Sequence, residues 1–210
     1  MIIFAPAYDE QTKACAQVAQ HVSASAPGKQ LIAADANRGA ILKELAAADA
    51  CMIFSHGAPD VICGQSDYPA LYPEDLPAIN HKAPIYAYAC YSAFFGQNSG
   101  DSTRVWWGYD KSMVPPPLGI LKREDIVGVF RYISHRFSHC ASIEDVEQLV
   151  EEIHVLCKSR VALYRRNGSA SMTSMVFFMQ IWTRLRVLTP WSDTPVLHAE
   201  SWQGDLDEMI

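Results

Sequence analysis

The chain of 210 residues lacks several patterns that mark whole classes of protein. No run of Lys and Arg is longer than two residues, and the formal net charge is −6. An acidic chain without a basic cluster argues against nucleic acid and against an anionic membrane surface as partners. The first ten residues have no basic segment followed by a long apolar one, and the longest apolar run, residues 175–182, is too short to cross a bilayer. We therefore expect a soluble, cytoplasmic protein.

Motifs for cofactors and metals are also missing. The sequence holds neither a phosphate-binding GxxxxGK[ST] loop nor a GxGxxG segment that opens a helix. The segment GQNSG at 96–100 does not match the GxSxG nucleophile elbow of serine hydrolases, and its composition favours a loop. The histidines at 135 and 139 stand beside Cys140 on an expected helix, but they lack the intervening Glu and a local third ligand, which favours an ordinary helix face. We expect no cofactor and no metal.

Close cysteine pairs are absent as well. The six cysteines form no CxxC motif and most lie among apolar residues, which is typical of reduced thiols and argues against disulfides. They stand at positions 15, 51, 63, 90, 140 and 157.

Short apolar runs alternate with amphipathic segments along the chain. Expected strands lie at 1–8, 30–36, 50–55, 83–90 and 104–110. Expected helices lie at about 9–24, with Asp9 and Thr12 as the cap, and at 38–49, with Asn37 as the cap. Further helices are expected near 122–138 and from 142 to a stop at Asn167 and Gly168. This alternation predicts an α/β fold, a three-layer α/β/α sandwich with a mostly parallel sheet.

The pattern predicts a single domain over residues 1–210. The sheet core with the site is expected in 1–110, and the C-terminal helices and tail in 120–210. Residues 170–188 stay open between helix and strand, whereas the apolar residues of the acidic tail, including Trp191, Val196 and Trp202, favour packing on the body.

Two of the expected strands end in residues suited to nucleophilic catalysis. The run CMIF is followed by Ser55, His56 and Gly57, and the run APIYAYAC ends in Cys90. Parallel strands end at the same edge of a sheet, so His56 and Cys90 are expected to emerge side by side. A thiol nucleophile, an imidazole base and the backbone amides of Gly57 and Cys90 as an oxyanion hole form the layout of a cysteine hydrolase. A glycine at 57 lets a substrate carbonyl approach the main chain closely.

The segments AADACMIFSHG and INHKAPIYAYACYSA resemble the caspase-like cysteine peptidases, including the bacterial CHAT-type members. In that family a strand ending in His-Gly precedes a strand ending in Ala-Cys, and here 34 positions separate His56 from Cys90. The resemblance covers the order of elements over about residues 1–110. It implies a caspase/haemoglobinase-like fold and an endopeptidase that cleaves a protein or peptide substrate through a thioester, with a partner protein that regulates it.

This chain departs from the family at two positions near the cysteine. Family members commonly carry Ser-Gly where this chain has Ser92 and Ala93, and relatives that cleave after basic residues place an acid where this chain has Tyr88. Basic specificity is therefore not indicated at Tyr88. Together with Tyr88, the carboxylates of Asp67 and Asp110 are the candidates for substrate binding.

Three aromatic residues lie near the same edge, Trp106, Trp107 and Tyr109, and their place in a strand favours the core over a substrate platform. Two other functions stay open. One is a catalytically inactive caspase-like interaction module in a signalling or defence complex, and the other is a hydrolase of small amides or esters that uses the same dyad.

Overall fold

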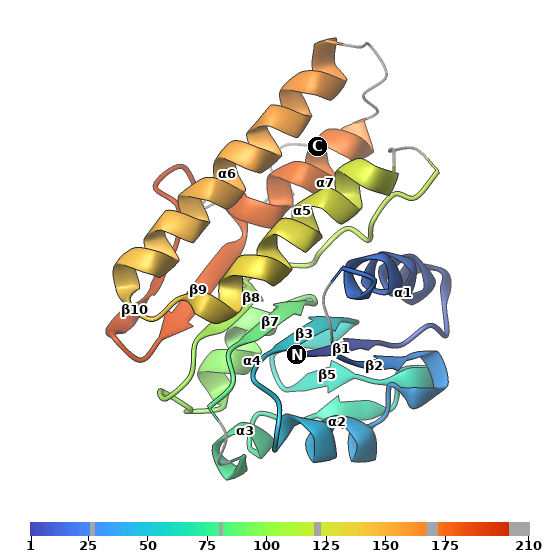
Figure 1. Ribbon diagram of the computed structural model, residues 1–210, viewed down its shortest axis with the longest axis vertical. Helices are drawn as coiled ribbons and strands as arrows, with labels where there is room; N and C mark the ends of the chain where they lie inside the picture. The colour runs from blue at the N-terminus through green and yellow to red at the C-terminus, as the bar shows by residue number, and fades with distance from the viewer. Residues whose placement is uncertain (26–27, 80–81, 120–122, 167–171, 202–210) are drawn as a thin grey trace.

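The computed structural model describes residues 1–25, 28–79, 82–119, 123–166 and 172–201. A seven-stranded sheet runs through the molecule in the order β10-β9-β8-β7-β3-β1-β2 (Figure 1). Neighbouring strands from β2 to β8 are parallel, whereas β9 is antiparallel to β8 and β10 to β9. The strands are β1 (Ile2–Ala5), β2 (Lys29–Ile32), β3 (Cys51–Phe54), β7 (Ile85–Tyr88), β8 (Trp106–Tyr109), β9 (Leu185–Thr189) and β10 (Ser192–Val196).

Helices cover both faces of this sheet. One face carries α1 (Glu10–Ser23), α5 (Arg123–Arg136), α6 (Ile143–Arg166) and α7 (Met172–Thr183), and the other carries α2 (Arg38–Leu45), α3 (Asp75–Ala78) and α4 (Ser92–Asn98) (Figure 1). Side chains along each strand alternate between the two cores, as Ile3 and Phe4 do in β1. Burial on both faces explains why the central strands β1, β3 and β7 are apolar throughout. The predicted three-layer sandwich is confirmed.

A second, antiparallel sheet follows β3 directly. It has the order β4-β5-β6, with β4 (Gly57–Ala58), β5 (Val61–Cys63) and β6 (Pro69–Leu71). Three short 3₁₀ helices, Ala33–Asp35, Gln65–Asp67 and Phe137–His139, complete the described elements. The second sheet sets the direction of the chain immediately after His56.

The interpretation of residues 96–100 as a loop is wrong for its first part, because Gly96–Asn98 belong to α4. The glycine serves packing, since a Cβ at Gly96 would lie 2.5 Å from the ring of Trp106. Trp106 itself is buried, as are Trp107 and Tyr109, so their interpretation as core residues is confirmed.

The segment at 170–188 contains both structures that the sequence left open, since α7 is followed by β9. The tail then forms β10, which pairs with β9 and buries Val196, while Trp191 is exposed. The C-terminal part therefore also supplies two strands of the main sheet. The expected helix stop at Asn167 and Gly168, and Trp202, lie outside the described residues. None of the described helices is both long and apolar enough to cross a membrane.

Candidate active site

Three neighbouring strands deliver polar side chains to one edge of the sheet. Asp9 follows β1, His56 follows β3 and Cys90 follows β7, and these strands are adjacent in the order β7-β3-β1. The chain moves from β1 to β2 on one side, whereas β3 lies on the other side of β1. Ligand sites of open α/β sheets lie where the strand order reverses in this way, at the carboxyl ends of the strands.

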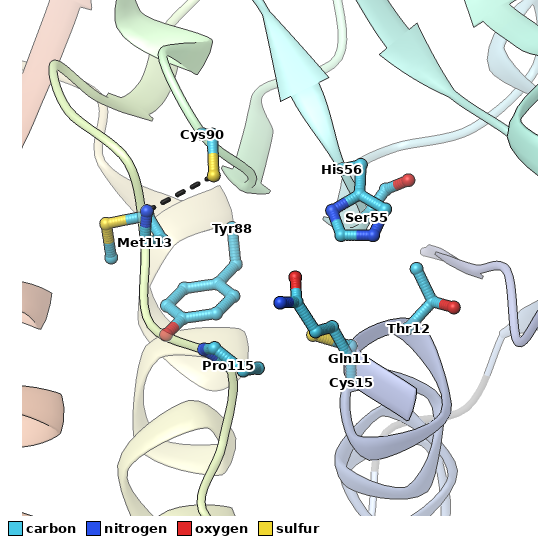
Figure 2. Close-up of a pocket in the computed structure, with 9 residues that line it drawn as sticks. All are labelled: Gln11, Thr12, Cys15, Ser55, His56, Tyr88, Cys90, Met113 and Pro115. Atoms are coloured by element: carbon cyan, nitrogen blue, oxygen red, sulfur yellow. Dashed lines mark hydrogen bonds between the residues drawn. The ribbon is translucent and has the colours of Figure 1, made fainter. Parts of the chain in front are cut away.

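His56 and Cys90 line one small pocket. Figure 2 shows the imidazole and the sulfur on opposite sides of a common space, with one ring nitrogen on the side of Cys90 and the other on the side of α1. The His56 side chain is 29% exposed, so a solvent-borne substrate can reach it. The other lining residues are Gln11, Thr12, Cys15, Ser55, Tyr88, Met113 and Pro115.

Asp9 holds the far side of the imidazole. Its Oδ2 lies 2.8 Å from Nε2 of His56, while its Oδ1 accepts from the backbone N–H and the hydroxyl of Thr12 at the start of α1. Burial alone would raise the pKa of Asp9, but the hydrogen bonds from Thr12 and His56 outweigh it and lower the pKa to about 2. Asp9 is therefore an ionised partner of His56 across the physiological pH range.

The bond to Asp9 fixes the role of each ring nitrogen. A neutral imidazole that donates from Nε2 to a carboxylate has its lone pair on Nδ1. Nδ1 is therefore the nitrogen that can accept a proton from a thiol. The sequence predicted Asp9 only as the cap of a helix, which it is, and missed this second contact.

The turn after β7 presents Cys90 to the pocket. Tyr91 has a left-handed backbone with φ of +54°, and the chain then enters α4. The buried Ser92 hydroxyl donates to the carbonyls of Ala87 and Ala89 and accepts from the Tyr109 N–H, which ties the turn to β7 and β8. The Cys90 sulfur accepts a hydrogen bond of 3.2 Å from the backbone N–H of Met113 (Figure 2).

Gly57 lies against the main chain of Cys90. A Cβ at Gly57 would stand 2.8 Å from the Cys90 carbonyl oxygen, so glycine is required by this close approach. The Cys63 N–H donates to the His56 carbonyl, which makes Gly57 and Ile62 a non-hydrogen-bonded pair. The N–H of Gly57 therefore points away from β5, on the outer edge of its sheet.

The three candidates for substrate binding fall in different places. Tyr88 lines the pocket, and its hydroxyl donates to the Val114 carbonyl. Asp67 accepts a hydrogen bond of 2.7 Å from the Tyr8 hydroxyl. The Tyr8 ring packs edge-on against His56, with ring centroids 5.9 Å apart, so Asp67 contacts the imidazole only through Tyr8.

Asp110 does not line this pocket. Its carboxylate forms an ion pair of 2.6 Å with Arg186, and its pKa is raised because burial outweighs the nearby cations. A basic substrate side chain that bound to Asp110 would have to displace Arg186 from this carboxylate.

The cysteines outside the turn have environments that disfavour a thiolate, and all six cysteines are free. Burial raises the pKa of Cys15 and Cys51 to about 12, and burial together with Asp67 raises the pKa of Cys63 to about 12. Burial also raises the pKa of Cys140 to about 11 and that of Cys157 higher still. A thiolate is the reactive form, so these five thiols are poor nucleophiles at neutral pH.

A cluster of potential metal ligands lies elsewhere, where α6 meets the segment after β10. Donor atoms of Glu151, His154 and His198 are all within 4.8 Å of one another. Both nitrogens of His198 are already engaged, since Nε2 lies 2.8 Å from Glu151 and Nδ1 accepts from the Glu200 N–H. With Nδ1 as an acceptor, Nε2 carries the proton and donates it to Glu151, so this hydrogen bond holds the segment after β10 to α6.

In comparisons with known proteins, no family model matches the chain and no curated protein matches it.

Proposed function

We propose that this chain is a cytoplasmic cysteine endopeptidase of the caspase-like, CHAT-type kind, acting on a protein or peptide substrate. The observation that carries the proposal is the convergence of Asp9, His56 and Cys90 from the carboxyl ends of three adjacent strands. The arrangement supplies a carboxylate to orient, an imidazole to move protons and a thiol to attack, in that spatial order.

The proposed reaction proceeds through an acyl-enzyme. The Cys90 thiol gives its proton to Nδ1 of His56, and the thiolate attacks the scissile carbonyl carbon, whose C=O electron pair moves onto oxygen. When the intermediate collapses, the C–N bond breaks and His56 protonates the departing amine, which leaves a thioester on Cys90. Water then gives a proton to His56 and attacks the thioester, and the acid product and the thiol are released. Asp9 stabilises the imidazolium that forms in both halves.

Two backbone amides are suited to hold the negative oxygen of the intermediate. The Gly57 N–H lies on the unpaired edge of β4, and among the described residues the Cys90 N–H has no acceptor. A backbone N–H donor accelerates acyl transfer when it faces the oxygen on which charge develops.

Replacement of Cys90 by alanine tests the proposal. We expect the wild-type protein to cleave members of a diverse peptide mixture, and Cys90→Ala to lose this activity by a factor on the order of 10⁴ or more. The variant lacks the thiol that forms the thioester, and burial raises the pKa of the other thiol in the pocket, that of Cys15, to about 12. Mass spectrometry of the mixture identifies the cleaved bonds, and circular dichroism checks that the variant folds.

Cys140→Ala is the matched control, because Cys140 is partly exposed and does not line the pocket, and it is expected to retain the activity. Cleavage that survives in Cys90→Ala, or a wild-type protein that cleaves no peptide in the mixture, would contradict the proposal.

A second candidate function is the inactive interaction module. It is favoured by the departures from the family at Ala93 and Tyr88. This function predicts that the Cys90→Ala variant keeps every binding property of the wild-type protein and that neither cleaves peptides.

A further inference from the structure

The loop after β8, residues 110–119, is hydrogen-bonded to the body through several successive residues. The Ser112 carbonyl accepts from the Arg184 guanidinium, the Met113 N–H donates to the Cys90 sulfur, and both backbone groups of Val114 are bonded. The Tyr91 N–H also donates to the Lys111 carbonyl at 3.1 Å, next to the nucleophile. The position of the Met113 N–H is therefore set by its neighbours in the loop.

Gln180 supplies the central anchor. Its Oε1 accepts from the Val114 N–H at 2.7 Å, and its Nε2 donates to the Val114 carbonyl at 2.7 Å and to the Tyr88 hydroxyl at 2.9 Å. The residue is 1% exposed and lies in α7, between Met179 and Ile181 in an apolar stretch. A buried amide is costly unless its polar atoms are hydrogen-bonded, and here both its oxygen and its nitrogen have partners.

We propose that Gln180 is a positioning residue for the nucleophile. Its side-chain amide clamps Val114 and thereby holds the preceding N–H, that of Met113, against the Cys90 sulfur. The inference rests on the proposed role of Cys90 as a nucleophile, but alkylation of the thiol tests it without any peptide substrate.

The clamp places a hydrogen-bond donor on the sulfur. An N–H donor stabilises a negatively charged sulfur more than a neutral one, so a correctly held Met113 N–H favours the thiolate form in which Cys90 reacts. α7 lies far from the pocket in sequence, yet through Val114 it controls the group that faces the sulfur. Gln180 touches neither Cys90 nor a substrate position, which distinguishes it from a catalytic residue.

Gln180→Met tests the clamp, because methionine has a similar volume but forms none of these hydrogen bonds. The rate at which iodoacetamide alkylates Cys90 is measured across a pH series by mass spectrometry of the tryptic peptide 83–104, in which Cys90 is the sole cysteine. We expect the rate near neutral pH to fall by a factor of about 3 to 10, while the limiting rate at high pH is unchanged.

Gln17→Met, at an exposed site on α1, is the matched control and is expected to follow the wild-type profile. Tyr88→Phe leaves both bonds between Gln180 and Val114 in place, so a smaller shift of the pH profile in the same direction is expected. This variant serves as the test if Gln180→Met fails to fold.

An unchanged alkylation rate in Gln180→Met would overturn the proposal. A rate that changes by the same factor at every pH would also overturn it, because such a change reports access to the sulfur and not stabilisation of the thiolate. Peptide cleavage that is absent while the alkylation profile shifts would contradict the peptidase function and leave the clamp standing.

Discussion

At the scale of single residues, Asp9 does two things with its two carboxylate oxygens. One oxygen caps α1 through Thr12 and the other binds His56, so the start of a helix and the orientation of the imidazole depend on the same side chain. The side chain is 41% exposed, which weakens its electrostatic effect by solvent screening.

Asp9→Asn separates the two tasks. Asparagine is as good a helix cap as aspartate, so α1 should persist, but the variant lacks the charge that stabilises the His56 imidazolium. We expect kcat/KM for a cleaved peptide to fall by about 10- to 100-fold, less than for the buried aspartate of a serine-protease triad because Asp9 is partly exposed.

The exposed Asp49→Asn, just before β3, is the control and should leave the rate unchanged. An equal loss of activity in both variants would show that charge near His56 is not the cause.

The sequence alone could predict His56 and Cys90 but not the contact of Asp9 with His56. His56 and Cys90 each follow an apolar run that reads as a strand. Because parallel strands end at the same edge of a sheet, the place of both residues at that edge could be predicted. Asp9 stands four residues beyond β1, and the capping pattern with Thr12 accounts for it completely. Its second contact depends on β1 and β3 being neighbours, which is a property of the strand order and not of the local sequence.

At the scale of elements, α4 and β8 are brought together by two glycines. A Cβ at Gly108 would lie 2.6 Å from the Ala93 backbone nitrogen, and one at Gly96 would collide with the Trp106 ring. The indole N–H of Trp106 donates to the Ser92 carbonyl at 2.7 Å in the same contact. This packing supports the turn on which Cys90 stands.

Gly108→Ala is expected to lower the free energy of unfolding by about 1–3 kcal/mol, because the backbone of α4 would have to move to admit the methyl group. Urea unfolding followed by tryptophan fluorescence measures the change.

Gly128→Ala is the matched control. Gly128 lies inside α5, and a Cβ there meets no atom within 4 Å, so this variant should be more stable by about 0.5–1 kcal/mol. Destabilisation of the same size in both variants would contradict the packing argument.

Elements with clear periodicity and caps could be predicted from the sequence, as α1 with Asp9 and α2 with Asn37 show. The helix α4 could not, because its seven residues include a glycine whose purpose is contact with Trp106. Nor could α7 and β9 be separated, because both are apolar and a single residue, Arg184, stands between them.

At the scale of the whole molecule, most of the carboxyl groups whose pKa departs from its ordinary value have a lowered pKa. Hydrogen bonds and ion pairs lower the pKa of a group of carboxyls below that of an unfolded chain, whereas burial raises the pKa of Asp110. The lowered group comprises Asp9, Asp75, Asp101, Glu151, Glu152 and Glu200. Their contribution to stability is complete above the unfolded pKa values, near about pH 4, and is lost as the pH falls through the lower folded values.

We therefore expect the urea midpoint to be constant between about pH 7 and pH 5 and to fall steadily below about pH 4. Arg38→Met checks the cause, because the hydrogen bonds from Arg38 are the largest influence that lowers the pKa of Asp75. This variant should be less stable at neutral pH by about 1 kcal/mol, since water screens the partly exposed arginine, and its stability should depend less on pH in acid. A variant with the wild-type acid slope would show that Asp75 does not contribute.

The residue that anchors the loop at Val114 follows Cys90 in the chain, and the ribosome therefore makes it later. Asp9, His56 and Cys90 are synthesised before Gln180, whose side-chain amide is bonded to both backbone groups of Val114. A nascent chain that stops before Gln180 therefore carries these three side chains without the amide that we propose holds the Met113 N–H on the Cys90 sulfur. Under the proposed function, the nucleophile gains its fixed N–H donor only after α7 has been synthesised.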